Sequence, residues 1–248
     1  MSEVAKNLKI IQDKILAASV KRPLEYKYFE PRLVAVSKFQ PPELIIDAYN
    51  AGQRHFGENY VNELEEKGNN PDILSNCRNI HWHFIGHLQR NKVNKLLNIP
   101  NLYMIETIDN EKIASALNTS WSKFRKQNDL KLKIMVQVNT SKEEGKSGCQ
   151  ISDVCPLVNY IINNCENLEF IGLMTIGMFG YDTAKGSNPD FLQLRECKHN
   201  VSNELGIDLE KIELSMGMSN DYEQAVELGS TNVRVGSAIF GQRPTKDK

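Results

Sequence analysis

The chain has 248 residues, of which 40% are hydrophobic and 25% are charged, an ordinary composition for a globular protein. Its formal net charge at pH 7 is −1. Because no basic excess is present, neither nucleic acid nor an anionic membrane is expected as a partner.

The N-terminal segment and the cysteines indicate a cellular compartment. Residues 1–14 mix charged with apolar side chains, which is unlike a signal peptide, and no later apolar run is long enough to span a bilayer. The five cysteines never form a CxxC pair, so we expect reduced thiols with structural roles. These features predict a cytoplasmic protein.

Hydrophobic periodicity predicts helices that alternate with strands. An amphipathic helix comes first, because apolar residues recur at spacings of three and four from Val4 to Ala18. The predicted strands are short apolar runs at residues 33–38, 54–57, 80–85, 102–106, 131–138, 168–175, 211–214 and 232–235. The helices between them are predicted at about residues 41–51, from 58 onward, at 88–97, 110–126 and 153–164, up to 205, and at 221–228.

Eight strands that alternate with helices, without a linker, indicate an α/β fold with one domain over residues 1–248. The length is that of a single (β/α)8 TIM-type barrel, about 250 residues. An open doubly wound sheet would usually carry a glycine-rich turn after the first strand, but residues 37–41 are Ser-Lys-Phe-Gln-Pro. Only thirteen residues follow Val235, so we expect the N-terminal helix to cover the place of a full eighth outer helix.

Lys38 ends the first predicted strand. Ligands bind at the carboxyl ends of parallel strands in α/β folds. A partly desolvated lysine there favours its neutral amine, which attacks carbonyl groups. Lys38 is therefore a candidate for a Schiff base, although a rim lysine whose ammonium reaches water is the alternative.

Two loops at the same predicted barrel mouth offer small residues and hydroxyl groups. Ser215, Met216 and Ser219 belong to the loop after the seventh strand, and Gly236 and Ser237 follow the eighth. Barrels often bind phosphate with the loops after these two strands. The pair of loops predicts a phosphate site, although either loop alone would suit a simple turn or helix cap.

Arg234 shares a strand face with Gly236, because the two residues are two positions apart. An arginine inside a barrel needs an acceptor, such as a heterocyclic nitrogen, a buried carboxylate or an internal salt bridge. A lysine for an aldehyde, an arginine for a ring nitrogen and hydroxyl loops for a phosphate together indicate pyridoxal 5'-phosphate as the cofactor.

Two further polar residues lie near predicted strand ends. Asn59 and His83 could form hydrogen bonds with substituents of the ring, or they could be a helix cap and a core histidine. His81 shares a strand face with His83, but no partner follows at a metal-ligand spacing, so no metal site is expected.

The chain resembles the pyridoxal phosphate homeostasis protein family, also called the proline synthetase co-transcribed family. The matching segments are AVSK (35–38), FGENYVNEL (56–64), WHFIGHLQRNK (82–92), GLMTIG (172–177), SMGMS (215–219) and VRVGSAIFG (233–241). The resemblance implies the barrel of alanine racemase without that enzyme's second, β-rich domain. It also implies a Schiff base at Lys38, Arg234 at the pyridine nitrogen, phosphate contacts from Ser215, Gly236 and Ser237, and ring contacts from Asn59 and Met216.

The functional alternatives are a cofactor-binding protein and an enzyme. Racemisation needs a second base, which the resemblance places in the missing domain, and a cationic Arg234 weakens the ring as an electron sink. We therefore expect a monomer that sequesters the cofactor and delivers it to pyridoxal-phosphate-dependent enzymes, without turnover. A weak amino acid racemase is the alternative. A third hypothesis, a Schiff-base aldolase that binds a sugar phosphate, would leave Arg234 without a role.

Overall fold

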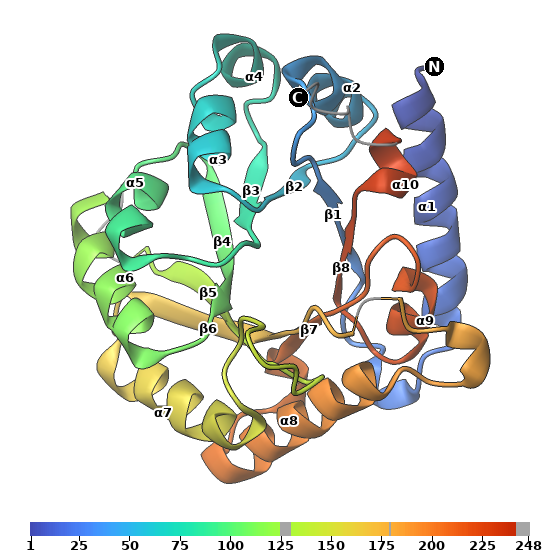
Figure 1. Ribbon diagram of the computed structural model, residues 1–248. Helices are drawn as coiled ribbons and strands as arrows, with labels where there is room; N and C mark the ends of the chain where they lie inside the picture. Colours follow the sequence, from blue (N-terminus) through green and yellow to red (C-terminus); the bar gives the residue numbers. More distant parts are fainter. Residues whose placement is uncertain (125–129, 179, 242–248) are drawn as a thin grey trace.

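A computed structural model describes residues 1–124, 130–178 and 180–241. Its eight parallel strands close into a barrel in sequence order, from β1 to β8 and back to β1. Helices surround this ring, as Figure 1 shows in a view along the barrel axis. The (β/α)8 fold expected from the alternation of strands and helices is confirmed.

The strands are β1 Arg32–Val36, β2 His55–Glu58, β3 His81–Phe84, β4 Leu102–Ile108, β5 Leu132–Gln137, β6 Leu168–Met174, β7 Glu213–Ser215 and β8 Asn232–Val235. The α-helices are α1 Glu3–Val20, α2 Pro42–Asn50, α3 Val61–Gly68, α4 Pro71–Asn76, α5 Val93–Leu97, α6 Glu111–Phe124, α7 Val154–Asn164, α8 Pro189–Leu205, α9 Tyr222–Glu227 and α10 Ser237–Phe240. Short 3-10 helices lie at Leu24–Tyr26, Arg90–Lys92, Ile151–Asp153, Thr183–Lys185 and Leu209–Lys211.

Most predicted elements agree with the structure, and two differences concern the seventh strand and the helix α4. The seventh strand was expected at residues 211–214, but Leu209–Lys211 form a 3-10 turn and β7 begins at Glu213. The short helix α4 was not predicted, although Pro71 at its start and the Asn70 cap, which accepts from Asp72 and Ile73, are ordinary start signals. The predicted end of the helix at residues 110–126 lies partly outside the described residues.

The N-terminal helix packs where an eighth outer helix would lie. Its buried face is Val4, Leu8, Ile11, Ile15 and Ala18, the periodic residues of the sequence. This face contacts α9 and α10, and α1 lies beside both in Figure 1. Because α10 has only four residues, α1 supplies the apolar cover that the expectation assigned to it.

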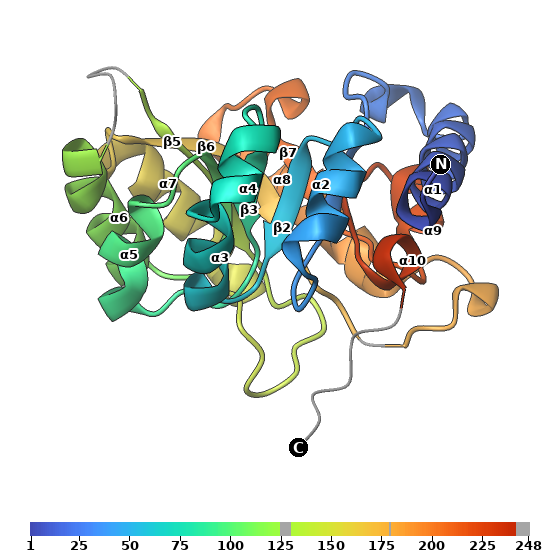
Figure 2. The ribbon, with the colours of Figure 1, turned by 90° about the horizontal axis from the view of Figure 1, so that it is seen from above.

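The two ends of the barrel differ. The loop after β5 extends beyond the ring of helices on one side, as Figure 2 shows, and α10 begins on that side after β8. This is the carboxyl end of the strands, where the chain has its longer connections. In the described part of the chain, no helix has the length and apolarity needed to cross a membrane.

Candidate functional site

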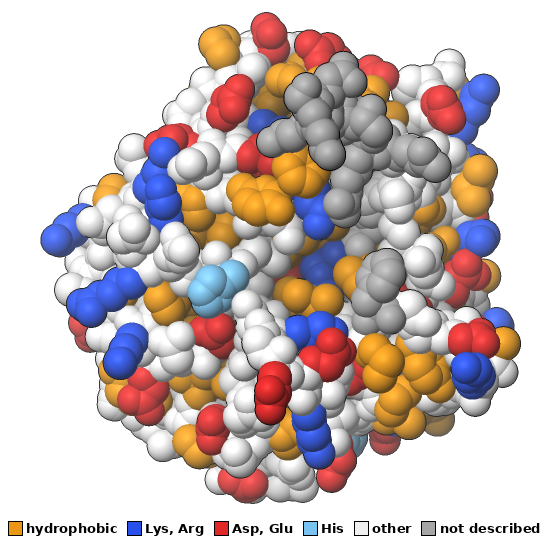
Figure 3. All heavy atoms as spheres, in the orientation of Figure 1, with side chains coloured by type: hydrophobic (Ala, Val, Ile, Leu, Met, Phe, Trp, Pro, Cys, Tyr) orange, Lys and Arg blue, Asp and Glu red, His pale blue; other side chains and the backbone are white. Residues whose placement is uncertain are grey.

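A pocket of about 440 Å³ opens at the carboxyl end of the barrel. Figure 3 shows Lys or Arg side chains in the recess at the centre of this face, with hydrophobic side chains around them. The predicted site residues that line the pocket are Lys38, Asn59, Ser219, Arg234, Gly236 and Ser237. Six of the nine predicted residues, which come from the carboxyl ends of β1, β2, β7 and β8, therefore meet in one cavity.

Lys38 reaches this pocket because it lies just beyond β1, which ends at Val36 and not at Lys38 as the sequence predicts. The buried residues Val34 and Ala35 pair with β8 and β2, so the end of the strand is fixed on both sides. Ser37 continues the pairing by donating its backbone N–H to the carbonyl of Gly57 at 3.0 Å. Lys38 itself is half-buried, which is the partly desolvated position that the sequence predicts for a reactive amine.

Arg234 lies in the floor of the pocket and is only 3% exposed. Its Nη1 donates to Ser215 Oγ at 2.6 Å, and its Nη2 donates to the carbonyl of Thr175 at 2.7 Å. Burial lowers the pKa of Arg234, while the charges of Glu106 and Asp221 act to raise it. A guanidinium in this position stays charged, so the base of the pocket carries a positive charge.

Glu106 is the buried carboxylate that balances this charge. It accepts from His83 Nδ1, from Ser215 Oγ, and from Asn232 Nδ2 at 3.0 and 3.1 Å. Burial alone would raise the pKa of Glu106, but the hydrogen bond and charge of His83, together with Arg234 and Ser215, lower it to about 2. Arg234 is thus connected to the negatively charged Glu106 through the hydroxyl of Ser215, which accepts from Arg234 and donates to Glu106.

Three predicted residues do not line the pocket: His83, Ser215 and Met216 are each 0% exposed and lie beneath it. His83 binds Glu106 with one nitrogen, and its Nε2 lies 2.9 Å from Nδ1 of His55. Met216 belongs to the hydrophobic core. The side chains of His83 and Ser215 are hydrogen-bonded to Glu106, and that of Met216 packs in the core, so none of the three lines the pocket. Their contact with a ligand stays a prediction.

The loops after β7 and β8 meet at one side of the pocket. Ser219 Oγ accepts the backbone N–H of Gly236 at 3.2 Å, which ties the two loops together. A Cβ at Gly236 would lie 3.2 Å from the carbonyl oxygen of Val36, so a side chain there would crowd β1. Gly217 has a φ of +96°, a conformation that favours glycine. The two hydroxyl residues of these loops, Ser219 and Ser237, line the pocket beside Gly236.

Asn59 offers an unused acceptor. Its Oδ1 is buried, and no donor reaches it among the described residues. A Cβ at Gly86 would lie 1.8 Å from the Asn59 carbonyl oxygen, so the loop after β3 packs tightly on this residue. A buried amide oxygen without a donor is costly, and a polar ligand in the pocket would satisfy it.

Other lining residues were missed from the sequence: Ile176, Met178, Tyr181, Met218, Asn220 and Asp221. They lie in the loops after β6 and β7, where no periodic pattern marks the inward side. Asp221 could have been found as a local turn residue, since its Oδ1 accepts the backbone N–H of Met218 at 2.6 Å. Over residues 1–124, 130–178 and 180–241, no group of three His, Cys, Asp or Glu side chains could hold a metal ion.

Comparisons with known sequences find a matching family model and close relatives of this chain. The model of the alanine racemase N-terminal domain matches residues 25–244. The human pyridoxal phosphate homeostasis protein is 51% identical over 246 residues, which cover 97% of this chain and 89% of the human protein. The Haemophilus influenzae protein of the same name is 39% identical and covers 96% of this chain and 94% of its own length.

Solved structures with a similar fold include a relative of this chain and an alanine racemase. PipY of Synechococcus elongatus, solved with PLP bound, is 29% identical, has a TM-score of 0.77 and covers 96% of this chain and all of its own. Alanine racemase from Corynebacterium glutamicum shares the fold at a TM-score of 0.59 and 14% identity. This chain covers 62% of that racemase's length.

Proposed function

The chain belongs to the pyridoxal phosphate homeostasis protein family, and we propose that it binds pyridoxal 5'-phosphate at the carboxyl end of its barrel. The observation that carries this proposal is the convergence of Lys38, Arg234 and the Ser219–Gly236–Ser237 group on one pocket. These are the three chemical types that an aldehyde, a ring nitrogen and a phosphate require. PipY, the PLP-bound relative, shares the fold over this whole region.

The residues present fit this cofactor. Bound pyridoxal phosphate supplies an aldehyde that condenses with amines and a pyridine ring that withdraws electrons. Lys38 would hold the aldehyde and Arg234 the ring nitrogen, while Ser219, Ser237 and the backbone at Gly236 would hold the phosphate. The unpaired Oδ1 of Asn59 would accept from a donor on the ring.

We infer that the protein sequesters the cofactor and passes it to pyridoxal-phosphate-dependent enzymes without turnover of its own. Arg234 supports this inference, since its guanidinium is charged at every accessible pH and does not give a proton to a ring nitrogen. Assays with a panel of L- and D-amino acids on the loaded protein test it. Sustained racemase or transaminase turnover would favour the alternative, a weak racemase.

The experiment that tests cofactor attachment is borohydride trapping in the Lys38→Ala variant. We expect the cofactor label to disappear from the protein, with the circular dichroism spectrum unchanged, because a half-buried rim lysine leaves no core cavity when it is shortened. Lys133→Ala is the matched control, since Lys133 is also half-buried but lies near the start of β5. Comparable labelling of another lysine in Lys38→Ala would refute the assignment.

The phosphate assignment is tested with Ser237→Asp. A carboxylate beside donors arranged for an anion repels phosphate, so we expect the Kd for pyridoxal phosphate to rise by at least about tenfold. The Kd for unphosphorylated pyridoxal should change much less. Titration of both ligands by absorbance measures the difference, and equal losses would place Ser237 away from the phosphate.

A further inference from the structure

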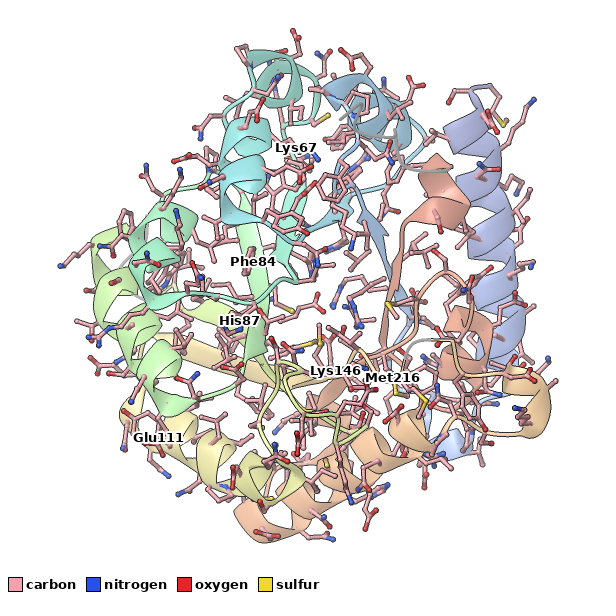
Figure 4. The ribbon with its side chains drawn as sticks, viewed as in Figure 1. Lys67, Phe84, His87, Glu111, Lys146 and Met216 are labelled. Carbon is pink, nitrogen blue, oxygen red and sulfur yellow. The ribbon has the colours of Figure 1, made fainter. Side chains whose placement is uncertain are left out.

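Charged side chains hold the backbone on both sides of Lys38. Lys67 Nζ donates to the carbonyl oxygen of Ser37 at 2.6 Å, and Glu63 Oε1 accepts the backbone N–H of Phe39. Lys67 and Glu63 both belong to α3, and Figure 4 shows Lys67 extending from that helix to the side where β1 and β2 lie. The two peptide units that flank Lys38 are thus tied to one helix.

The backbone at this point has a conformation that needs support. Phe39 has a φ of +62°, in the left-handed region, although it is neither glycine nor asparagine. A bulky residue in that region is strained and persists only when its surroundings fix it. The Glu63 carboxylate supplies a charged acceptor for the N–H of that same residue, and so holds the turn that directs Lys38 into the pocket.

Lys67 is itself fixed by two carboxylates, and we call Glu58, Glu63 and Lys67 the Lys67 cluster. Lys67 Nζ lies 2.7 Å from Glu58 Oε1 and 2.6 Å from Glu63 Oε1, and its side chain is 7% exposed. Glu58 also accepts from the hydroxyl of Ser37 at 2.7 Å. All three N–H groups of Lys67 therefore have acceptors, and these contacts fix its ammonium group beside the Ser37 carbonyl.

Stability alone does not explain the Lys67 cluster. Buried ion pairs contribute little net stability compared with apolar residues of similar volume, because each charge must be desolvated. This cluster makes contacts on either side of Lys38, which is the lysine that lines the pocket among the described residues. Its placement indicates a role in the geometry of Lys38.

We propose that Glu63 and Lys67 are positioning residues for Lys38, which set the reach and reactivity of its amine by holding the Ser37 and Phe39 peptide units. This inference rests on the proposed function, because it assigns the residues that prepare the same site. Neither side chain lines the pocket, so both act through the backbone and not on a ligand.

The test measures how fast Lys38 condenses with pyridoxal phosphate and with pyridoxal, by stopped-flow absorbance over a range of pH. Glu63→Ala removes the acceptor for the Phe39 N–H, and Glu63→Gln keeps an acceptor oxygen. Lys67→Met removes the charge but keeps the apolar stem. Glu65→Ala is the matched control, because Glu65 lies on the same helix but pairs with Lys95 on the surface.

We expect Glu63→Ala and Lys67→Met to slow condensation with both aldehydes by about tenfold or more and to shift the pH midpoint of the rate, since small misplacements of a nucleophile are costly. Glu63→Gln should recover most of the rate, and Glu65→Ala should match wild type. If Lys67→Met does not fold, the two Glu63 variants decide alone.

The outcomes separate this inference from the proposed function. A wild-type protein that attaches no cofactor at Lys38 would contradict the proposed function itself. A wild-type protein that attaches it normally, with Glu63→Ala unchanged in rate and pH midpoint relative to Glu65→Ala, would overturn only the positioning role.

Discussion

Two buried carboxylates lie near the pocket residues Arg234 and Lys38, and they differ in how completely they are hydrogen-bonded. Glu106 lies beneath Arg234, and Glu58 lies beneath the turn that carries Lys38, and both side chains are 0% exposed. Both oxygens of Glu106 accept hydrogen bonds. Glu58 Oε1 accepts from Ser37 and Lys67, but its Oε2 is buried without a donor among the described residues.

This difference separates the charge states of the two regions. The pKa of Glu106 is lowered to about 2, because its donors outweigh burial. Burial raises the pKa of Glu58 to about 7, against the opposing effect of Lys67. Burial alone therefore does not decide whether a carboxylate is charged; the number and charge of its donors decide it. Arg234 is linked through Ser215 to a carboxylate that stays charged, whereas Ser37, the residue before Lys38, is hydrogen-bonded to a carboxyl group that titrates near neutral pH.

The largest effect is expected from removing the fixed charge. Glu106→Gln leaves Arg234 buried without its balancing carboxylate and weakens the contacts of His83, so we expect a loss of about 3–5 kcal/mol in the free energy of unfolding at pH 7. Urea denaturation measures this loss. Glu65→Gln is the control, since its surface pair should contribute under about 1 kcal/mol. A loss no larger than that of the control would mean that Arg234 does not depend on Glu106.

A smaller effect is expected from the titration of Glu58. The folded protein holds the Glu58 proton up to about pH 7, while the unfolded chain releases it near 4.5. Stability should therefore fall as pH rises between these values, by about 2–3 kcal/mol from this group. Glu106 acts with the opposite sign, since its pKa is lowered, and its contribution is lost as pH falls below about 4.5 towards 2.

The measurement is the free energy of unfolding in urea from pH 5 to 8 for wild type and Glu58→Gln. Other titrating groups are common to both proteins, so the difference between the curves isolates Glu58. The variant should gain on wild type as pH rises. Parallel curves would show that Glu58 does not titrate in this range.

The smallest effect is expected from Glu58→Gln at pH 5. Wild-type Glu58 is already neutral at that pH, and Lys67 keeps its bonds to Glu63 and to the Ser37 carbonyl. The two proteins should agree within about 1 kcal/mol. A larger loss would mean that Glu58 is ionised even at pH 5. The contrast between Glu58 and Glu106 would then disappear.

The sequence predicted the barrel well because its strands are marked by local patterns. The eighth strand, Asn232–Val235, was placed at its observed bounds, and the alternation of side chains correctly put Arg234 on the inner face beside Gly236. Depth along the barrel axis is not encoded by that alternation. For this reason the sequence could not show that the side chains of His83 and Ser215 are fully buried and do not line the pocket.

The Lys67 cluster was missed for a different reason. Glu63 and Lys67 are four residues apart on a helix, a spacing that usually indicates a solvent-exposed ion pair. Nothing in the sequence near Lys67 shows that it is buried, because its acceptor at Ser37 lies thirty residues away and is brought close only by the pairing of β1 with β2. Long-range contacts of this kind appear only once the fold is known.

The pairing of β1 with β8 has a consequence for synthesis of the protein. Val34 pairs with Arg234, two hundred residues later, so the ring can close only after β8 has left the ribosome. Closing so long a loop is slow relative to local helix formation. Since Lys38 follows β1 and Arg234 lies on β8, a nascent or truncated chain that lacks β8 has no complete pocket. We therefore expect pyridoxal phosphate to be bound only by chains in which β8 has been synthesised.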